Sequence, residues 1–153
     1  MLIDLTYRCN MGCNHCMSDC KPNGTDMTPE ILKDVLAFCK KNEVPNLIFS
    51  GGEMFENPHI LELLKIIEKE WDKRFPLSFI TNGRKLADTP DIFEAVQDMQ
   101  KKYGKKKIMI QVTDDPRFYP QPLSEKQKYR LKKLDAVIEG VPGNGNKCLY
   151  PQG

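Results

Sequence analysis

The feature that most constrains the fold of this chain is a regular alternation between short apolar segments and segments with helical periodicity. Five segments are typical of strands because they are short, apolar and bounded by polar or turn-forming residues. They cover residues 2–7, 46–50, 77–81, 107–112 and 134–139. Strands and helices that alternate in this way predict a parallel sheet with right-handed crossovers.

Three of the intervening helices are expected to begin at a capping residue that is followed by a proline. The three pairs are Thr28-Pro29, Asn57-Pro58 and Thr89-Pro90. In the first of these helices the apolar residues recur at helical spacing, so a core-facing side is expected. Its members are Ile31, Val35, Leu36 and either Phe38 or Cys39. A short basic helix is expected over residues 124–132.

Five strands are too few for a closed eight-stranded barrel. The expected fold is therefore α/β, either an open, partial βα barrel with about five parallel strands or a doubly wound sheet. We expect one domain over residues 1–139 and an irregular tail over 140–153, which is rich in Gly, Pro and Asn. The chain is then either a minimal protein or part of a longer one, and a second protein is a further way to complete the open barrel.

The net charge and the hydropathy of the sequence argue against two classes of binding partner, nucleic acids and membranes. The formal net charge of +2 creates no strong field for nucleic acid or an anionic membrane. The sequence has no apolar run long enough to span a bilayer, and no secretory signal pattern follows Met1. We therefore expect a cytoplasmic protein without a membrane partner. Thiols stay reduced in that compartment, which disfavours a disulfide framework and favours metal binding.

Four of the six cysteines fall within residues 9–20. Cys9 and Cys13 are separated by three residues, and Cys13 and Cys16 by two. Structural zinc sites usually combine two distant cysteine pairs, which makes zinc the less favoured alternative here. Three thiolates on one loop suit a [4Fe–4S] cluster in which one iron keeps an open position.

The unusual loops all follow strand-like segments. The cysteine loop follows the first, Gly51-Gly52-Glu53 the second, Asn82-Gly83 the third and Thr113-Asp114-Asp115 the fourth. The carboxyl ends of parallel strands meet at one edge of a sheet, which is where such folds place their active sites. The sequence therefore predicts a single site at this edge.

These residues resemble the radical S-adenosylmethionine (radical SAM) superfamily. The segment from Leu5 to Cys16 is similar to its CxxxCxΦC signature, in which the usually aromatic Φ position is His15, and Gly51-Gly52-Glu53 is similar to its glycine–glycine–acidic motif. Residues 111–116 together with Thr81-Asn82-Gly83 also resemble the small radical SAM proteins of the mobile-pair type.

The resemblance implies an enzyme with a partial barrel, a [4Fe–4S] cluster on Cys9, Cys13 and Cys16, and S-adenosylmethionine (SAM) on the open iron. One-electron cleavage of SAM would give a 5′-deoxyadenosyl radical that abstracts hydrogen from an unknown substrate, with a small flavoprotein or ferredoxin as reductant. The resemblance also implies a set of residues that bind SAM, with His15 near the adenine and the glycines near the methionine ammonium. They are His15, Ser50, Gly51, Gly52, Glu53, Thr81, Asn82, Gln111 and Thr113.

The sequence departs from the family pattern in two respects, the number of βα units and the motif on the fifth strand. Family members usually have six βα units and a motif on the fifth strand, which residues 138–141 match poorly. Cys20 leaves open a second hypothesis, a non-catalytic iron–sulfur module that serves electron transfer or acts as a partner subunit. In this hypothesis Cys20 is the fourth ligand and the module does not use SAM. Cys148 is either a lone thiol or an auxiliary ligand, and Cys39 is expected in the core.

Overall fold

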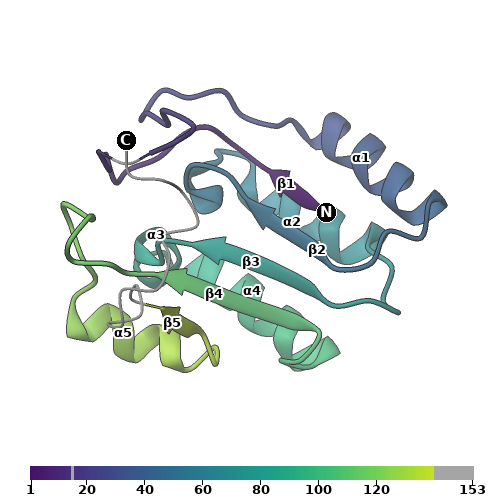
Figure 1. Cartoon of the computed structure of the whole chain (residues 1–153). Helices are drawn as coiled ribbons and strands as arrows, with labels where there is room; N and C mark the ends of the chain where they lie inside the picture. The colour runs from purple at the N-terminus through teal and green to yellow at the C-terminus, as the bar shows by residue number, and fades with distance from the viewer. Residues whose placement is uncertain (15, 140–153) are drawn as a thin grey trace.

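The computed structural model describes residues 1–14 and 16–139. The predictions for His15, for Cys148 and for a tail at 140–153 therefore lie outside the described residues. The described chain forms one parallel sheet with the strand order β1-β2-β3-β4-β5 (Figure 1). The strands are β1 (Leu2–Asp4), β2 (Leu47–Ser50), β3 (Leu77–Thr81), β4 (Ile108–Thr113) and β5 (Val137–Glu139).

The order of the strands decides between the two predicted architectures. It follows the order in the chain, so each crossover moves one strand further in the same direction (Figure 1). A doubly wound sheet would reverse this direction at a switch point. The prediction of an open, partial βα barrel with five parallel strands is confirmed for the described residues, and the doubly wound sheet is excluded for them.

The helices form a continuous layer, in which neighbours contact one another in the order α1, α2, α4, α3 and α5. In Figure 1, α2 and α4 lie behind the sheet, while α1 and α5 lie near its edge strands. Among the described residues, no helix is both long and apolar enough to cross a bilayer. The helices are α1 (Pro29–Lys41), the 3-10 turn η1 (Met54–Glu56), α2 (Ile60–Glu70), α3 (Arg84–Asp88), α4 (Pro90–Tyr103) and α5 (Glu125–Lys132).

Helix α1 corrects part of the expected core. It buries Leu32, Leu36 and Cys39, whereas Ile31 and Phe38 are exposed. The buried positions lie four and three residues apart, so they form their own helical stripe, displaced from the one predicted. The prediction was right for Leu36 and wrong for Ile31, and of the alternatives Phe38 and Cys39 the structure buries Cys39. Both stripes are apolar, and only packing against α2 selects one.

The expected cap at Asn57 is also wrong. Helix α2 begins at Ile60 after His59, and Asn57 instead ends the turn η1. The prediction of a basic helix at 124–132 is confirmed by α5, where Ser124 and Gln127 form a capping box.

The two faces of the sheet differ in how far they are covered. Alternate strand residues point to opposite faces. One face is packed against the helices and carries the buried residues Ile3, Leu47, Phe49, Leu77, Phe79, Ile108, Ile110 and Val112. The other face carries half-buried Ile48, Ser78 and Ile80, together with Met109, which is 43% exposed. This second face is therefore open within the described chain. Parallel sheets are usually covered on both faces, so an open face is unusual.

Candidate cluster and cofactor site

Loops from four strands meet around one cavity of about 220 Å³ at the carboxyl edge of the sheet. The loop after β1 contributes the cysteines, and the loops after β2, β3 and β4 contribute glycine, hydroxyl and amide groups. The residues that border the cavity are Cys9, Met11, Gly12, Cys13, Cys16, Met17, Ser18, Cys20, Ser50, Gly51, Gly52, Ile80, Thr81, Asn82, Thr113 and Tyr119. Nine of the predicted site residues are in this set. Glu53 and Gln111 are not, and His15 lies outside the described residues.

The cysteines of the loop border the cavity and differ in solvent exposure. Cys9 and Cys13 are half-buried and Cys16 is exposed. Burial, followed by neighbouring thiols, raises the pKa of the Cys13 thiol to about 11, and burial also raises the pKa of the Cys9 thiol. These two thiols are therefore neutral at pH 7, and a metal that binds them must displace their protons.

Cys20 borders the same cavity. Its backbone N–H donates to the Cys16 sulfur over 3.3 Å, and burial raises the pKa of its thiol to about 11. Across residues 1–14 and 16–139, no three His, Cys, Asp or Glu side chains are placed to hold a single metal ion.

The glycines after β2 are required by close backbone packing. The Gly51 N–Cα torsion φ is +141°, and a Cβ there would clash with the carbonyl oxygen of Thr6. A Cβ on Gly52 would lie 2.5 Å from the carbonyl oxygen of Arg8 and 2.9 Å from the Cβ of Cys20. The Gly52 N–H donates to the Thr6 carbonyl over 2.8 Å, and the Glu53 N–H donates to the Arg8 carbonyl over 2.8 Å. The absence of side chains thus lets this loop lie directly against the start of the cysteine loop.

Glu53 is fully buried and holds the next loop. One carboxylate oxygen accepts hydrogen bonds from the Thr81 hydroxyl (2.7 Å) and the Phe55 N–H (3.2 Å), and the other accepts from the Asn82 N–H (2.7 Å). Thr81 in turn accepts from the Gly83 N–H over 2.9 Å. These contacts give Glu53 a positioning role between the loops after β2 and β3.

Burial of Glu53 predicts a pH dependence of stability. Desolvation, partly offset by the three donors, raises the pKa of this carboxyl to about 7 from 4.5. The folded chain therefore retains a proton between these pH values that the unfolded chain has lost, so the contribution to stability is full below pH 4.5 and is lost by about pH 7. On this basis the wild-type chain loses on the order of 3 kcal/mol of unfolding free energy over that range.

In Glu53→Gln this loss is expected to disappear, because an amide does not titrate. Urea unfolding of the metal-free chain at several pH values measures it, with Glu62→Gln at an exposed position of α2 as the control. The variant should also be less stable at low pH by about 1–3 kcal/mol, since its NH₂ group faces a backbone or hydroxyl donor. Parallel stability curves for wild type and Glu53→Gln would contradict this assignment.

Two residues of the site could not be singled out in the sequence. Asn10 lies between the cysteines, where its amide donates to Glu56 over 2.8 Å and its oxygen accepts from the Asn82 amide over 3.0 Å. Asn10 thereby links the cysteine loop to the loops after β2 and β3. No periodicity or spacing marks such a residue, because its partners are 46 and 72 positions away.

Tyr119 is the second such residue. Its hydroxyl donates to the Thr113 hydroxyl over 2.6 Å, and its ring borders the cavity. The loop that carries it is anchored by Asp114, which accepts from the Leu123 N–H (2.9 Å) and pairs with Lys128 (3.3 Å). An aromatic segment after β4 was the signal in the sequence, but it did not distinguish Tyr119 from Phe118.

The donor set fits an iron–sulfur cluster. Four cysteines of one loop border one cavity, among them Cys9, Cys13 and Cys16, and thiolates are the usual ligands of such clusters. Gly51, Gly52, Thr81 and Thr113 border the same space, so a small polar molecule bound beside the cluster would meet residues of three further loops or strand ends. The fold and the site together define a partial βα barrel whose carboxyl edge carries a cavity bordered by cysteines.

The comparison with known families agrees with this description. The family model of the Radical SAM superfamily matches residues 3–114, and the chain belongs to this superfamily. The predicted family membership is confirmed. Members of this superfamily use a [4Fe–4S] cluster and S-adenosylmethionine, which are the two cofactors that the resemblance implied.

Similar proteins are considerably longer than this chain. YydG of Bacillus subtilis, which is named as a peptide biosynthesis protein, is 34% identical over 83 residues, which are 53% of this chain and 25% of that protein. A Methanocella arvoryzae protein named as a GTP 3′,8-cyclase is 31% identical over 86 residues, which are 56% of this chain and 27% of that protein. The chain thus spans about a quarter of the length of either relative.

A solved structure supports the fold. The crystal structure of Streptococcus suis SuiB bound to its precursor peptide SuiA superposes with a TM-score of 0.72 at 15% identity. The alignment covers 91% of this chain and 32% of that chain. At this identity the likeness concerns the fold alone.

Proposed function

We propose that this chain is the catalytic core of a radical SAM enzyme. In this proposal Cys9, Cys13 and Cys16 hold a [4Fe–4S] cluster, and SAM binds beside it at the remaining iron. When bound, these groups supply a one-electron cleavage of SAM whose 5′-deoxyadenosyl radical abstracts hydrogen from a substrate. The observation that carries the proposal is the convergence of three cysteines, Gly51-Gly52 and the β3 and β4 loops on one cavity.

The remaining roles are assigned to residues that border or support this cavity. Ser50, Gly51 and Gly52 offer backbone groups to the amino acid part of SAM, while Thr81, Asn82 and Thr113 offer hydroxyl and amide groups to its other polar atoms. Glu53 acts through Thr81 and Asn82 rather than by contact, because it does not border the cavity. Tyr119 forms part of the wall and limits the access of water, which a radical reaction requires.

The substrate is proposed to approach along the open face of the sheet. Ile80 lies on this face and also borders the cavity, so the face is continuous with the site. The names of the two relatives point to peptides and to a nucleotide, and the site residues favour neither class. A second protein or another segment that covers this face would complete the barrel, and a small flavoprotein or ferredoxin would supply the electron.

The first test is spectroscopic. The chain is reconstituted with iron and sulfide without oxygen, reduced, and examined by electron paramagnetic resonance before and after SAM is added. The proposal predicts a changed cluster signal, because SAM binds directly to an iron. An unchanged signal from a fully loaded chain would contradict the proposal.

The alternative is an electron-transfer module in which Cys20 is the fourth ligand. It is favoured by one observation, since Cys20 borders the cavity and its N–H donates to the Cys16 sulfur. The Cys20→Ala variant separates the two functions. We expect it to bind as much iron as wild type and to retain the response to SAM, whereas Cys16→Ala should lose both. Loss of the cluster in Cys20→Ala would favour the alternative.

A further inference from the structure

The cysteine loop is closed at its base by two chain segments that run side by side. The chain leaves the sheet through residues 5–8 and returns through residues 21–27, and we call these two segments the neck. Backbone bonds join them: the Tyr7 N–H donates to Thr25 (2.8 Å), the Met27 N–H to Leu5 (2.9 Å) and the Cys9 N–H to Lys21 (3.0 Å). All three proposed iron ligands lie on the loop that this neck closes.

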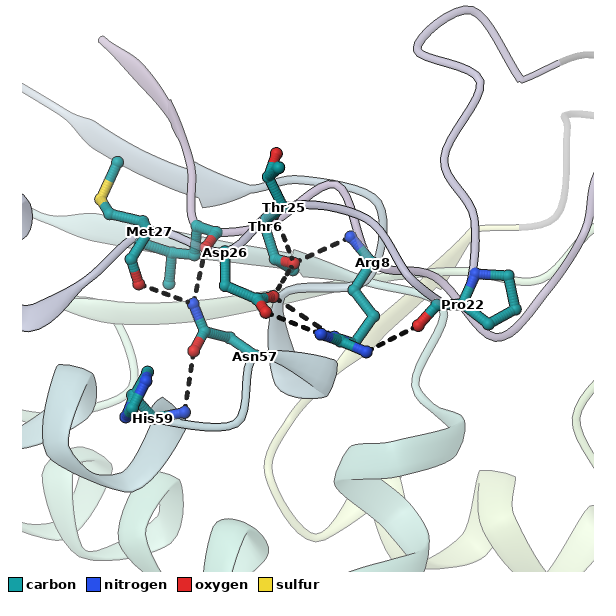
Figure 2. Close-up of polar contacts among 9 residues, drawn as sticks. Thr6, Arg8, Pro22, Thr25, Asp26, Met27, Asn57 and His59 are labelled. Atoms are coloured by element: carbon teal, nitrogen blue, oxygen red, sulfur yellow. Dashed lines mark hydrogen bonds and ion pairs between the residues drawn. The ribbon is translucent and has the colours of Figure 1, made fainter.

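A carboxylate on the returning segment binds two side chains of the leaving segment (Figure 2). The Arg8 guanidinium donates to Asp26 over 2.8 and 3.4 Å, and the Thr6 hydroxyl donates to the same carboxylate over 2.5 Å. Arg8 also donates to the Pro22 carbonyl over 2.7 Å. The Asp26 side chain is only 17% exposed, so solvent screens this pair less than an open surface pair.

Asn57 joins the same two segments from the other side. Its amide group donates to the Leu5 carbonyl (2.7 Å) and to the Met27 carbonyl (3.0 Å), and its oxygen accepts from the His59 N–H (2.8 Å), as Figure 2 shows. Asn57 is 1% exposed. Both of its donors are therefore used to tie the neck to the start of α2.

We propose that Arg8, Asp26 and Asn57 are positioning residues that fix the neck and thereby preorganise the cysteine loop for its cluster. The inference rests on the proposed cluster at Cys9, Cys13 and Cys16. Ordering a loop costs conformational entropy, and a loop with fixed ends has already lost part of that entropy before its ligand binds. Arg8 directly precedes Cys9, so movement of the neck moves the first ligand against the Gly51-Gly52 loop.

The test compares two changes of an Arg–Asp pair. Asp26→Asn removes the charge that Arg8 binds and keeps the shape of the side chain. Asp72→Asn is the matched control, because Asp72 is 18% exposed and accepts from Arg74 over 2.7 and 3.0 Å, in a pair outside the cysteine loop. The rate of iron loss from the reconstituted chain to a chelator is followed without oxygen by visible absorbance, and circular dichroism checks that each variant is folded.

We expect Asp26→Asn to lose iron about tenfold faster than wild type, which corresponds to about 1.4 kcal/mol, while Asp72→Asn stays within twofold of wild type. Equal acceleration in both variants would overturn the proposal, because it would mark a general loss of stability. Wild-type rates in Asp26→Asn would overturn it as well. If Asp26→Asn is unfolded, Arg8→Lys takes its place, since lysine keeps the charge and lacks the two-pronged geometry.

Proteolysis of the metal-free chain keeps this test separate from the proposed function. Met17 on the loop is 71% exposed, so thermolysin can reach the loop, and mass spectrometry assigns each cut. Cleavage within residues 9–20 should be several times faster in Asp26→Asn than in Asp72→Asn, whether or not any cluster forms. If the chain takes up no iron but shows this difference in cleavage, the proposed function is contradicted. The proposal that the neck orders the cysteine loop would still hold. Equal cleavage would overturn the neck proposal itself.

Discussion

Replacing Cys13 with alanine is expected to reduce the iron bound after reconstitution from about four atoms per chain to fewer than one. Cys13 is the middle of the three proposed ligands, all of which border the cavity, and its loss leaves two thiolates of the proposed set. A cluster that has lost one of three protein ligands has neither the charge nor the fixed geometry to stay on the loop. Iron and sulfide analysis, with the visible and electron paramagnetic resonance spectra, measures the effect.

Cys39→Ala is the matched control for this change. Cys39 is 3% exposed and lies on the buried side of α1, where it packs in the core outside the cavity. We expect this variant to bind iron as wild type does and to lose about 1 kcal/mol of unfolding free energy. A Cys13→Ala chain with a full cluster and an unchanged spectrum would refute the assignment of Cys9, Cys13 and Cys16 as the ligands.

Gly51→Ala is expected to destabilise the metal-free chain by about 3–5 kcal/mol. The new Cβ would meet the Thr6 carbonyl oxygen, which also accepts the hydrogen bond from the Gly52 N–H. The Thr6 backbone has little room to move, because the hydroxyl of this residue is bound to Asp26 within the neck. Urea unfolding followed by circular dichroism gives the free energy directly.

Gly104→Ala isolates the part of this cost that comes from the backbone torsion. Gly104 has a φ of +92°, and a Cβ there would have no atom within 4 Å. Its replacement should therefore show only the strain of an unfavourable torsion, of about 1–3 kcal/mol. If Gly51→Ala costs no more than Gly104→Ala, the close packing of the β2 loop against Thr6 is not what requires glycine.

The fold could be predicted well where a segment carries a single pattern of apolar residues. The runs at 46–50 and 77–81 became β2 and β3 almost without change, because they are apolar and stop at turn-forming residues. The shared edge of the four loops followed from parallel strands. Helix α1 was harder, since two overlapping apolar stripes fit its sequence and contact with α2 chose between them. The short helix α3 was not predicted, because five residues carry too little periodic signal.

The candidate site was predictable in its position and less so in its roles. The cysteine spacing and Gly51-Gly52 are local patterns, and the structure places them around one cavity. Glu53 was expected among the residues that bind SAM, yet its carboxylate is buried and accepts from the backbone of the loop after β3. Asp26 carries no motif, and Asn57 was marked only as a helix cap. Their importance depends on contacts between distant parts of the chain, which a single sequence does not contain.

The most direct test of the proposed function is the fate of SAM. The reconstituted chain is reduced without oxygen, SAM is added, and 5′-deoxyadenosine and methionine are measured over time against the Cys13→Ala variant. We predict that wild type forms both products in equal amounts and that the variant forms neither. A wild-type chain that holds its full cluster and forms neither product would contradict the central claim that this cavity cleaves SAM.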